Sequence, residues 1–269
     1  KENLIADKEQ AFLSRTLATI DTQAPIEIGL DDIVYQGPRI EELVQFYDDM
    51  GFKQLRAQLG TTNTQEEEVL DFQIVSEVSS AMFKKDQFFY FEILGENYHR
   101  EEVVGLAWGD KDGIYVGGPK LLDSPVLKDF LEHQPIKTYD FKRGKVLLAR
   151  KGIDLLPATF DSRLAKYLLS TVDDNALTTI AHLYGQTSLI PDEAIYGKGA
   201  KLALPERDVF FPHLARKVQV LLETEAPMLA KLEENQQSDL LFEMELPLAN
   251  VLAKMEIAGI KVKVETLKA

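Results

Sequence analysis

The stretch Gln87–Gly118, QFFYFEILGENYHREEVVGLAWGDKDGIYVGG, contains three apolar runs separated by polar turns. These runs are residues 88–94, 103–108 and 114–116. Apolar and aromatic runs bounded by such turns are typical of neighbouring antiparallel strands. The sequence therefore predicts a three-stranded meander, the beginning of an antiparallel or mixed sheet. The first run contains the carboxylate Glu92, which would be costly to bury without a partner.

Composition limits the classes of protein to which the chain can belong. Its 269 residues, 45% of them hydrophobic, are enough for one large or two modest domains. The absence of cysteine excludes disulfides, thiolate metal sites and a thiol nucleophile. No apolar run reaches the roughly 18 residues of a membrane span, so a cytoplasmic location without membrane contact is expected. The net charge of -14 argues against direct binding to nucleic acid.

The residues around the meander predict mostly helices. Helical patterns are followed by short connections, and one polar stretch without periodicity, residues 60–68, is expected to be a linker. Strands are also expected at residues 72–75, at an edge, and at 137–139, and an exposed loop at 190–205. The expected helices are residues 3–20, 39–50, 122–132, 140–151, 162–169, 177–184, 209–234 and 240–258. Ser124 and Asp161 stand where helix caps are needed. Strands followed by helices favour an α/β or α+β fold with about five strands.

Five runs resemble the 3'-5' exonuclease domain of the bacterial DNA polymerase I family, and more closely its degenerate, Bacillus-type version. They are FEILGENYHREEVVGLAWG, TYDFKRGKVLLARKGIDL, ATFDSRLAKYLL, PDEAIYGKGAK and HLARKVQVLLETEAPML. The resemblance implies a ribonuclease H-like fold, a mixed sheet flanked by helices. Residues 7–20, 30–37 and 50–55 are similar to the end of the family's 5'-nuclease domain, and residues 245–262 to the opening helix of its polymerase domain.

The resemblance therefore implies a piece of a longer chain with four parts. Residues 1–59 would end a 5'-nuclease domain, residues 60–70 would be a linker, residues 71–228 the exonuclease-like domain, and residues 229–269 the start of the polymerase domain. A first residue other than Met and a helical pattern at Ala269 agree with this interpretation. The implied partners are the remaining domains of the same chain and, through the parent enzyme, primer-template DNA, in the bacterial cytoplasm near the nucleoid.

The carboxylates of the family's nuclease site are largely missing from the matching positions. Glu92 stands where the first motif has Asp, and Leu94 where it has Glu. Gly144 stands at the Asp of the second motif. In the third motif, His213 stands at the Tyr and Lys217 at the Asp. The resemblance therefore implies no catalytic residue, metal or cofactor in this chain, with Mg²⁺ belonging to the parent polymerase.

Three alternatives remain open at this stage. Glu92 is interpreted first as a half-buried carboxylate paired with Lys217, which would neutralise both charges. An unorthodox exonuclease is the second interpretation, with a metal site rebuilt from Glu92, Glu96, Asp140 and Asp161, although the last two favour roles at helix starts. The third interpretation is a docking module for DNA or protein, to which Lys198 and Lys201 of the YGKGAK loop would add weak DNA contacts.

Overall fold

The computed structural model describes residues 7–23, 25, 39–50, 52, 70–171, 174–186 and 188–268. The chain divides into two compact units, residues 1–63 and 64–269. The first unit contains helices α2 (Lys8–Ala18) and α3 (Ile40–Asp49), which confirm the two helical patterns. The linker expected at residues 60–68 lies outside the described residues.

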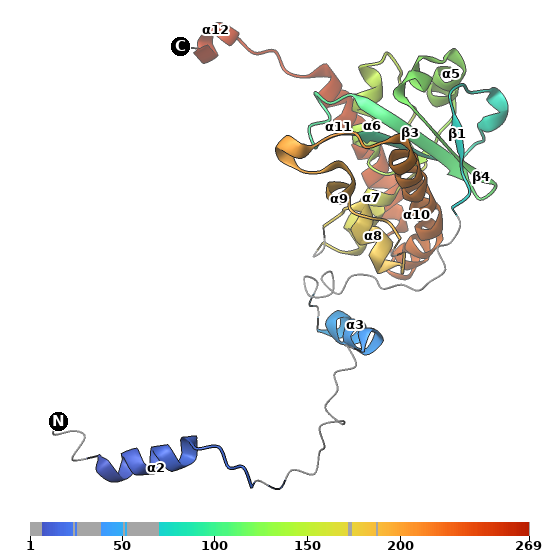
Figure 1. Cartoon of the computed structure of the whole chain (residues 1–269). Coiled ribbons are helices and arrows are strands. Elements are labelled where there is room, and N and C mark those ends of the chain that lie inside the picture. Colours follow the sequence, from blue (N-terminus) through green and yellow to red (C-terminus); the bar gives the residue numbers. More distant parts are fainter. Residues whose placement is uncertain are drawn as a thin grey trace. The chain divides into compact units, whose positions relative to one another are not determined.

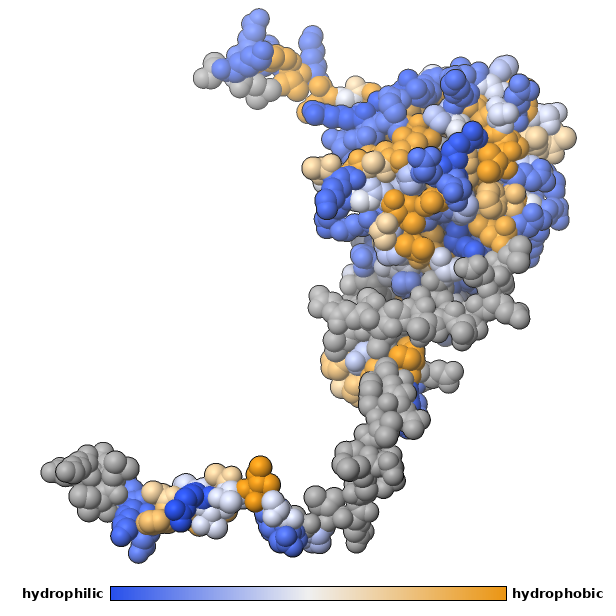
Figure 2. All heavy atoms as spheres, viewed as in Figure 1, coloured by the Kyte–Doolittle hydropathy of each residue, from blue (hydrophilic) through white to orange (hydrophobic). Residues whose placement is uncertain are grey.

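Helix α2 exposes its apolar side chains. Phe12, Leu13 and Leu17 are about half or more exposed, and no residue of α2 is buried. Figure 2 shows hydrophobic and hydrophilic residues interspersed along the surface of this helix. The amphipathic pattern that predicts this helix is therefore not matched by a buried face among the described residues.

The second unit is built on a mixed sheet of six strands in the order β1-β4-β3-β2-β5-β6. The strands are β1 (Gln73–Val75), β2 (Phe88–Ile93), β3 (Val103–Asp110), β4 (Gly113–Gly117), β5 (Lys137–Thr138) and β6 (Phe160–Asp161). Strands β2, β3 and β4 form the predicted antiparallel meander, with Tyr90 opposite Ala107 and Trp108 opposite Tyr115. Strand β1 pairs in parallel with β4 at the predicted edge. The sixth strand, β6, exceeds the expected count because its two residues are too few to produce a sequence pattern.

Helices surround this sheet, and most of them follow the predicted ranges. They are α5 (Pro125–His133), α6 (Phe141–Ala149), α7 (Ser162–Leu169), α8 (Leu177–Leu183), α9 (Asp192–Tyr196), α10 (Arg207–Glu234), α11 (Leu246–Ala258) and α12 (Val264–Lys268). A π-helical turn, Leu240–Glu245, leads into α11, and short 3₁₀ turns cover Ser80–Met82, Pro119–Asp123 and Gly199–Lys201. None of the helices among these described residues is long and apolar enough to cross a membrane.

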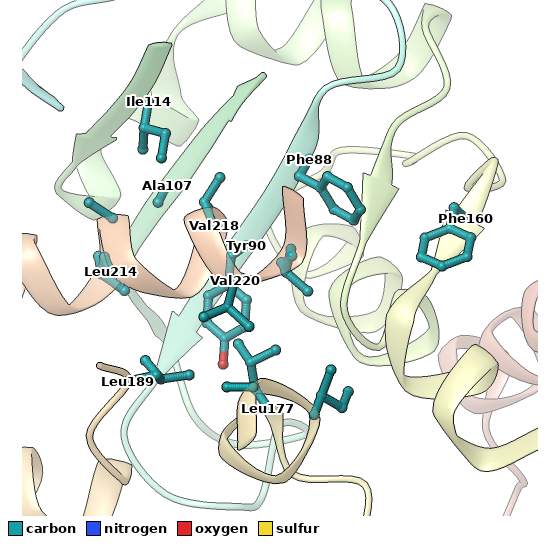
Figure 3. Packing of buried hydrophobic residues seen from close by; sticks show 14 of the residues in the cluster. Phe88, Tyr90, Ala107, Ile114, Phe160, Leu177, Leu189, Leu214, Val218 and Val220 are labelled. Carbon is teal, nitrogen blue, oxygen red and sulfur yellow. The ribbon is translucent and has the colours of Figure 1, made fainter. Parts of the chain in front are cut away.

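Strand β2 is buried on both faces and separates two apolar clusters. Phe88 and Tyr90 point into a cluster with α7, α8 and α10, whereas Phe89 and Phe91 point into a cluster with α5 and α6. Successive side chains of a strand alternate between faces, which explains the division. Figure 1 shows α10 lying across one face of the sheet, and Figure 3 shows its residues Leu214 and Val218 beside the strands.

The prediction of an exposed loop at residues 190–205 is wrong in part. This segment contains α9 and a 3₁₀ turn, and Tyr196 at the end of α9 is only 4% exposed. Leu189, just before it, is also buried. The loop was expected because the segment is rich in Gly and Lys (YGKGAK), but one aromatic and one aliphatic side chain attach it to the core.

The predicted caps differ in what their side chains do. Asp161 accepts hydrogen bonds from the backbone N–H groups of Arg163 and Leu164 at the start of α7, as predicted. Asp140 similarly accepts from the N–H of Arg143 in α6. Ser124 stands at the N-cap position of α5, but its side chain makes no capping hydrogen bond.

Candidate functional site

Helix α10 lies unusually close to the sheet beside Glu92. Gly105, which is opposite Glu92 in the β2–β3 pair, has Phe210 of α10 against it, and a Cβ there would be only 2.7 Å from that ring. Phe210, His213 and Lys217 follow one another at helical spacing and therefore share a face of α10. The absence of a side chain at Gly105 thus allows α10 to place Lys217 next to β2.

Lys217 and Glu92 form a buried ion pair. The ammonium of Lys217 donates to Glu92 Oε2, and both side chains are 2% exposed. The pairing agrees with the prediction, but Glu92 is fully buried and not half-buried as expected. Burial alone would lower the pKa of Lys217, but the charge of Glu92, together with the interactions of Tyr90 and Asp192, outweighs burial and raises that pKa. The lysine is therefore charged at neutral pH, and the pair is internally neutral.

A second carboxylate, Asp192 of α9, contacts the same ammonium. Its two oxygens lie 2.7 and 2.9 Å from Lys217 Nζ, and its Oδ1 lies 2.6 Å from His213 Nε2. Burial alone would raise the pKa of Asp192, but the hydrogen bond with His213 and the charge of Lys217 lower it to about 2. Asp192 therefore attaches α9 to α10 through two side chains of one helix face.

Two tyrosines complete this group of side chains. Tyr196 of α9 donates its hydroxyl to Glu92 Oε2 at 2.9 Å, and the hydroxyl of Tyr90 lies 3.4 Å from Lys217 Nζ. The ammonium also lies 4.8 Å from the centre of the Tyr90 ring, within the range of a cation–π contact. Burial and the charge of Glu92 raise the pKa of Tyr196, so its hydroxyl remains a donor. We call Glu92, Lys217, Asp192, His213, Tyr90 and Tyr196 the lysine cluster.

Leu94 and Gly144 lie outside the lysine cluster. Leu94 is partly buried against the apolar residues on the α10 side of the sheet. Gly144 is buried in α6, where a Cβ would be 3.4 Å from the ring of Phe91. Phe91 points to the face of the sheet opposite Glu92, so Gly144 adds no polar group to the cluster.

The alternative ligands Glu96, Asp140 and Asp161 serve other roles or face solvent. Glu96 is exposed beyond Gly95, and Asp140 pairs with Arg163. Asp161 accepts from the N–H groups of Asp140 and Phe141 in addition to those of α7. Burial and the charge of Asp140 raise the pKa of Asp161 to about 6. Among the residues that the structure describes, no three His, Asp or Glu side chains are placed to hold a metal ion.

The donor set of the lysine cluster does not fit a resident divalent cation. The ammonium of Lys217 already contacts the oxygens of Glu92 and Asp192 that a divalent cation would need. Two pockets of about 460 and 450 Å³ lie elsewhere, and neither is lined by Glu92 or Lys217. The chemistry available at this position is therefore charge neutralisation and helix attachment.

Sequence reasoning missed Asp192 and Tyr196. Both lie in the run PDEAIYGKGAK, which carried part of the family resemblance, but the run was interpreted through its lysines. A signal was present, because an apolar Ile195-Tyr196 pair after an acidic start is typical of a short amphipathic helix. Lys198, singled out for weak DNA contact, lies on the surface, with its Nζ 3.3 Å from Glu193.

Comparison with known proteins places this fold in a family. A family model described as the ribonuclease H-like domain of DNA polymerase I matches residues 89–224. The chain belongs to this family. DNA polymerase I of Streptococcus pneumoniae serotype 4 is 58% identical over 268 residues, covering 99% of this chain and 31% of that protein. DNA polymerase I of Bacillus subtilis is 36% identical over 279 residues, covering 100% of this chain and 32% of that protein. The chain thus spans about a third of these relatives.

Solved structures agree with the ribonuclease H-like fold. Brucella melitensis NrnC has a TM-score of 0.55 at 20% identity, covering 71% of this chain and 96% of that one. The polymerase domain of Pol1 from M. smegmatis, in complex with DNA primer-template and dNTP, has a TM-score of 0.57 at 21% identity. It covers 73% of this chain and 34% of the other. The predicted mixed sheet with flanking helices is therefore confirmed, with six strands instead of about five.

Proposed function

We propose that this chain is a ribonuclease H-like domain that no longer degrades DNA and that supports the rest of a bacterial DNA polymerase I. The observation that carries the proposal is the buried contact of Lys217 with Glu92 and Asp192. Metal-dependent nucleases hold two cations roughly 3.5–4 Å apart with clustered carboxylates. A fixed ammonium within such a cluster repels those cations and satisfies the oxygens that would bind them.

The structural role follows from what the lysine cluster joins together. Its side chains come from β2, α9 and α10, and β2 is far from both helices in the sequence. Each buried charge has a partner, so the cluster is expected to stabilise one arrangement of these elements. The domain retains its apolar clusters on both faces of the sheet, which is what a supporting role requires.

The activity of the whole protein is also a proposal, because the chain spans about a third of its relatives. The name that these relatives share supports template-directed DNA synthesis, in replication and repair, as the activity of the parent enzyme. Its partners would be primer-template DNA and the other domains of the same chain, and its Mg²⁺ would be bound outside these residues. The bacterial cytoplasm, close to the nucleoid, is the proposed location.

A nuclease assay on the wild-type chain tests the loss of exonuclease activity. A 3'-labelled single strand is incubated with the chain in Mg²⁺ or Mn²⁺, beside an active proofreading nuclease as the positive control. Calorimetric titration with Mn²⁺ runs in parallel. We expect neither degradation nor metal binding. Degradation that is abolished in Glu92→Ala would overturn the proposal, because it would show that the site is rebuilt around that carboxylate.

The supporting role is tested separately in the full-length polymerase. Replacing Lys217 by Met should lower the temperature at which the enzyme loses activity, because it leaves two carboxylates without their cation. Nucleotide incorporation at a low temperature should be unchanged. A variant whose thermal inactivation matches the wild type would show that the cluster does not support the polymerase.

A further inference from the structure

A pocket of about 450 Å³ is lined by residues of α6, α7 and α11. Its lining includes five residues outside the lysine cluster, namely Tyr167, Asn175, Glu245, Leu248 and Leu252. Tyr167 belongs to α7, and the two leucines belong to α11. Sites for small organic ligands are concave, mostly apolar and of about this size. The pocket is therefore large enough to hold one such ligand.

Two cationic side chains also line the pocket, and each already has a carboxylate partner. Lys142 Nζ lies 2.5 Å from Glu256 Oε1, and Arg163 forms an ion pair with Asp140. An anionic ligand would have to compete with these carboxylates for the two cations. The pocket therefore does not favour an anion.

The two remaining carboxylates of the pocket lining differ in their surroundings. Asp161 is buried and accepts hydrogen bonds from four backbone N–H groups. Glu245 is only partly exposed, and its carboxylate makes no hydrogen bond or ion pair with any residue that the structure describes. Glu245 is therefore the carboxylate of this lining whose charge is left to be matched by a ligand.

The face of α11 places apolar surface beside this charge. Glu245 ends the π-helical turn that leads directly into α11, so residues three and seven positions later lie on its side of the helix. These residues are Leu248 and Leu252, which are 44% and 40% exposed. Seven residues of helix extend about 10 Å along the axis. A ligand with a positive end and an apolar chain matches this face.

Two further residues of the lining suit a positively charged N–H donor. The side-chain oxygen Oδ1 of Asn175 is buried and has no hydrogen-bond partner. An unpaired buried acceptor is unfavourable, and rotation of the amide toward the pocket would allow it to accept from a ligand. Tyr167 is 48% exposed, and an aromatic ring attracts a cation placed over its face.

We propose that this pocket binds a primary alkylammonium ion. Glu245 binds the ammonium, Asn175 and Tyr167 add a hydrogen bond and a cation–π contact, and the leucines of α11 contact the alkyl chain. An ammonium has three N–H donors and can satisfy more than one acceptor. A free aliphatic amine and a lysine side chain of another protein share this chemistry. The inference goes beyond the proposed function and requires neither DNA nor a metal ion.

Titration of the ¹⁵N-labelled wild-type chain with n-hexylammonium chloride tests the site. We expect saturable shifts of the amide resonances around Tyr167, Asn175 and Glu245, with a dissociation constant in the millimolar range. 1-Hexanol is the matched ligand control, because it keeps the chain and lacks the charge, and it should bind about fivefold more weakly. Equal binding of the alcohol overturns the proposal, as does the absence of shifts at these residues.

Variants of the acidic residue separate a specific contact from general attraction to an acidic protein. Glu245→Gln should weaken hexylammonium binding about fivefold. Glu243→Gln is the matched control, because Glu243 is exposed in the same turn and does not line the pocket. It should bind as the wild type does. Equal weakening in the two variants overturns the proposal, because it would show that only the net charge matters.

Variants of α11 test the contact with the alkyl chain. Leu252→Ala should weaken binding of hexylammonium, whereas Val251→Ala should not, because Val251 is 51% exposed and lies outside the pocket lining. Amide spectra away from the pocket show whether each variant is folded. Equal binding by Leu252→Ala and the wild type would contradict the proposed position of the chain.

A last comparison distinguishes the two sources of the ammonium. Nα-acetyl-lysine methylamide is titrated beside hexylammonium under the same conditions. Tighter binding of the blocked lysine assigns the pocket to a lysine side chain of a partner protein, and tighter binding of hexylammonium assigns it to a free amine. These titrations contain no DNA and no divalent metal, so their outcome is separate from that of the nuclease assay.

Discussion

The ammonium of Lys217 and the carboxylate of Glu92 are in direct contact, and each side chain is only 2% exposed. Neither charge has access to solvent, so each depends on the other and on Asp192 and Tyr196 for its solvation. Breaking a buried pair is usually far more costly than replacing both partners with apolar groups. The lysine cluster therefore predicts an asymmetry between single and double substitutions.

Lys217→Met should destabilise the chain by about 3–5 kcal/mol, because it leaves Glu92 as an uncompensated buried charge. Adding Glu92→Leu should recover a large part of this loss by removing the second charge. Urea denaturation of the wild type, both single variants and the double variant measures the coupling. Single-variant effects that simply add would contradict a direct interaction.

An exposed ion pair provides the matched control for the comparison of the Lys217 and Glu92 variants. Lys198 Nζ lies 3.3 Å from Glu193, with both side chains largely exposed. Solvent screens such pairs, so Lys198→Met should leave the denaturation midpoint nearly unchanged. A loss at Lys198 comparable with that at Lys217 would mean that removal of any positive charge, and not burial, causes the effect.

Restoring one family carboxylate at Gly144 should not restore nuclease activity. The new side chain of Gly144→Asp would begin 3.4 Å from the ring of Phe91 and 3.9 Å from Leu155, in apolar surroundings. We expect a loss of about 2–4 kcal/mol from crowding and from burying a charge. Degradation of a 3'-labelled strand in Mg²⁺ should remain absent.

Gly144→Ala separates crowding from charge at the same position. Its Cβ would make ordinary van der Waals contact with Phe91, and Gly is roughly 1 kcal/mol less favourable than Ala inside a helix. The Ala variant should therefore be as stable as the wild type or slightly more stable in thermal unfolding. Destabilisation by Ala similar to that by Asp would show that α6 has no space for any side chain.

The sequence predicted the central meander and the Glu92–Lys217 pair for physical reasons that do not depend on fine detail. Strands β2 to β4 are apolar runs between short turns, a pattern that predicts strands from local sequence alone. A carboxylate within a buried strand requires a positively charged partner, and the family resemblance indicated Lys217 as that partner. Asp192 was not predicted because its contact depends on where α9 packs, which no local pattern reveals.

The two predicted cap residues show that local sequence is not sufficient to predict a capping hydrogen bond. Asp161 and Ser124 both precede helices and have suitable side chains, yet only Asp161 makes capping bonds. Local sequence indicates which residue stands at the N-cap position. The rotamer of that residue's side chain, which decides whether it makes a capping bond, depends on the atoms that surround it. Asp161 also accepts from the N–H of Phe141 at 2.7 Å, a contact between two helix starts that the sequence did not predict.

Asp161→Ala should therefore cost more than a single helix cap. The carboxylate accepts from the N–H groups of Asp140, Phe141, Arg163 and Leu164, so its loss removes the acceptor of four backbone N–H groups around the starts of α6 and α7. Single caps contribute typically about 1 kcal/mol, and we expect a loss of about 2–4 kcal/mol in urea denaturation. Ser124→Ala is the control and should have little effect. Equal effects would contradict the double-capping role.

The pH dependence of Asp192 tests the charge of Lys217 directly. The pKa of Asp192 in the folded chain is lowered to about 2, compared with about 3.9 for an unfolded aspartate. A lowered carboxyl pKa contributes stability above the unfolded pKa, and this contribution is lost as the pH falls through the folded pKa. The stability difference between wild type and Asp192→Asn should therefore be largest above pH 4 and should shrink toward pH 2.

Carboxyl ¹³C resonance titration of Asp192 measures the same property without unfolding the chain. In the wild type, its midpoint should lie near 2, well below the value of about 3.9 for an unperturbed aspartate. In Lys217→Met, the midpoint should rise, because the positive charge of Lys217, one of the interactions that favour the carboxylate of Asp192, is gone. A midpoint that does not move would mean that His213, which keeps its hydrogen bond to Asp192, determines the pKa without Lys217.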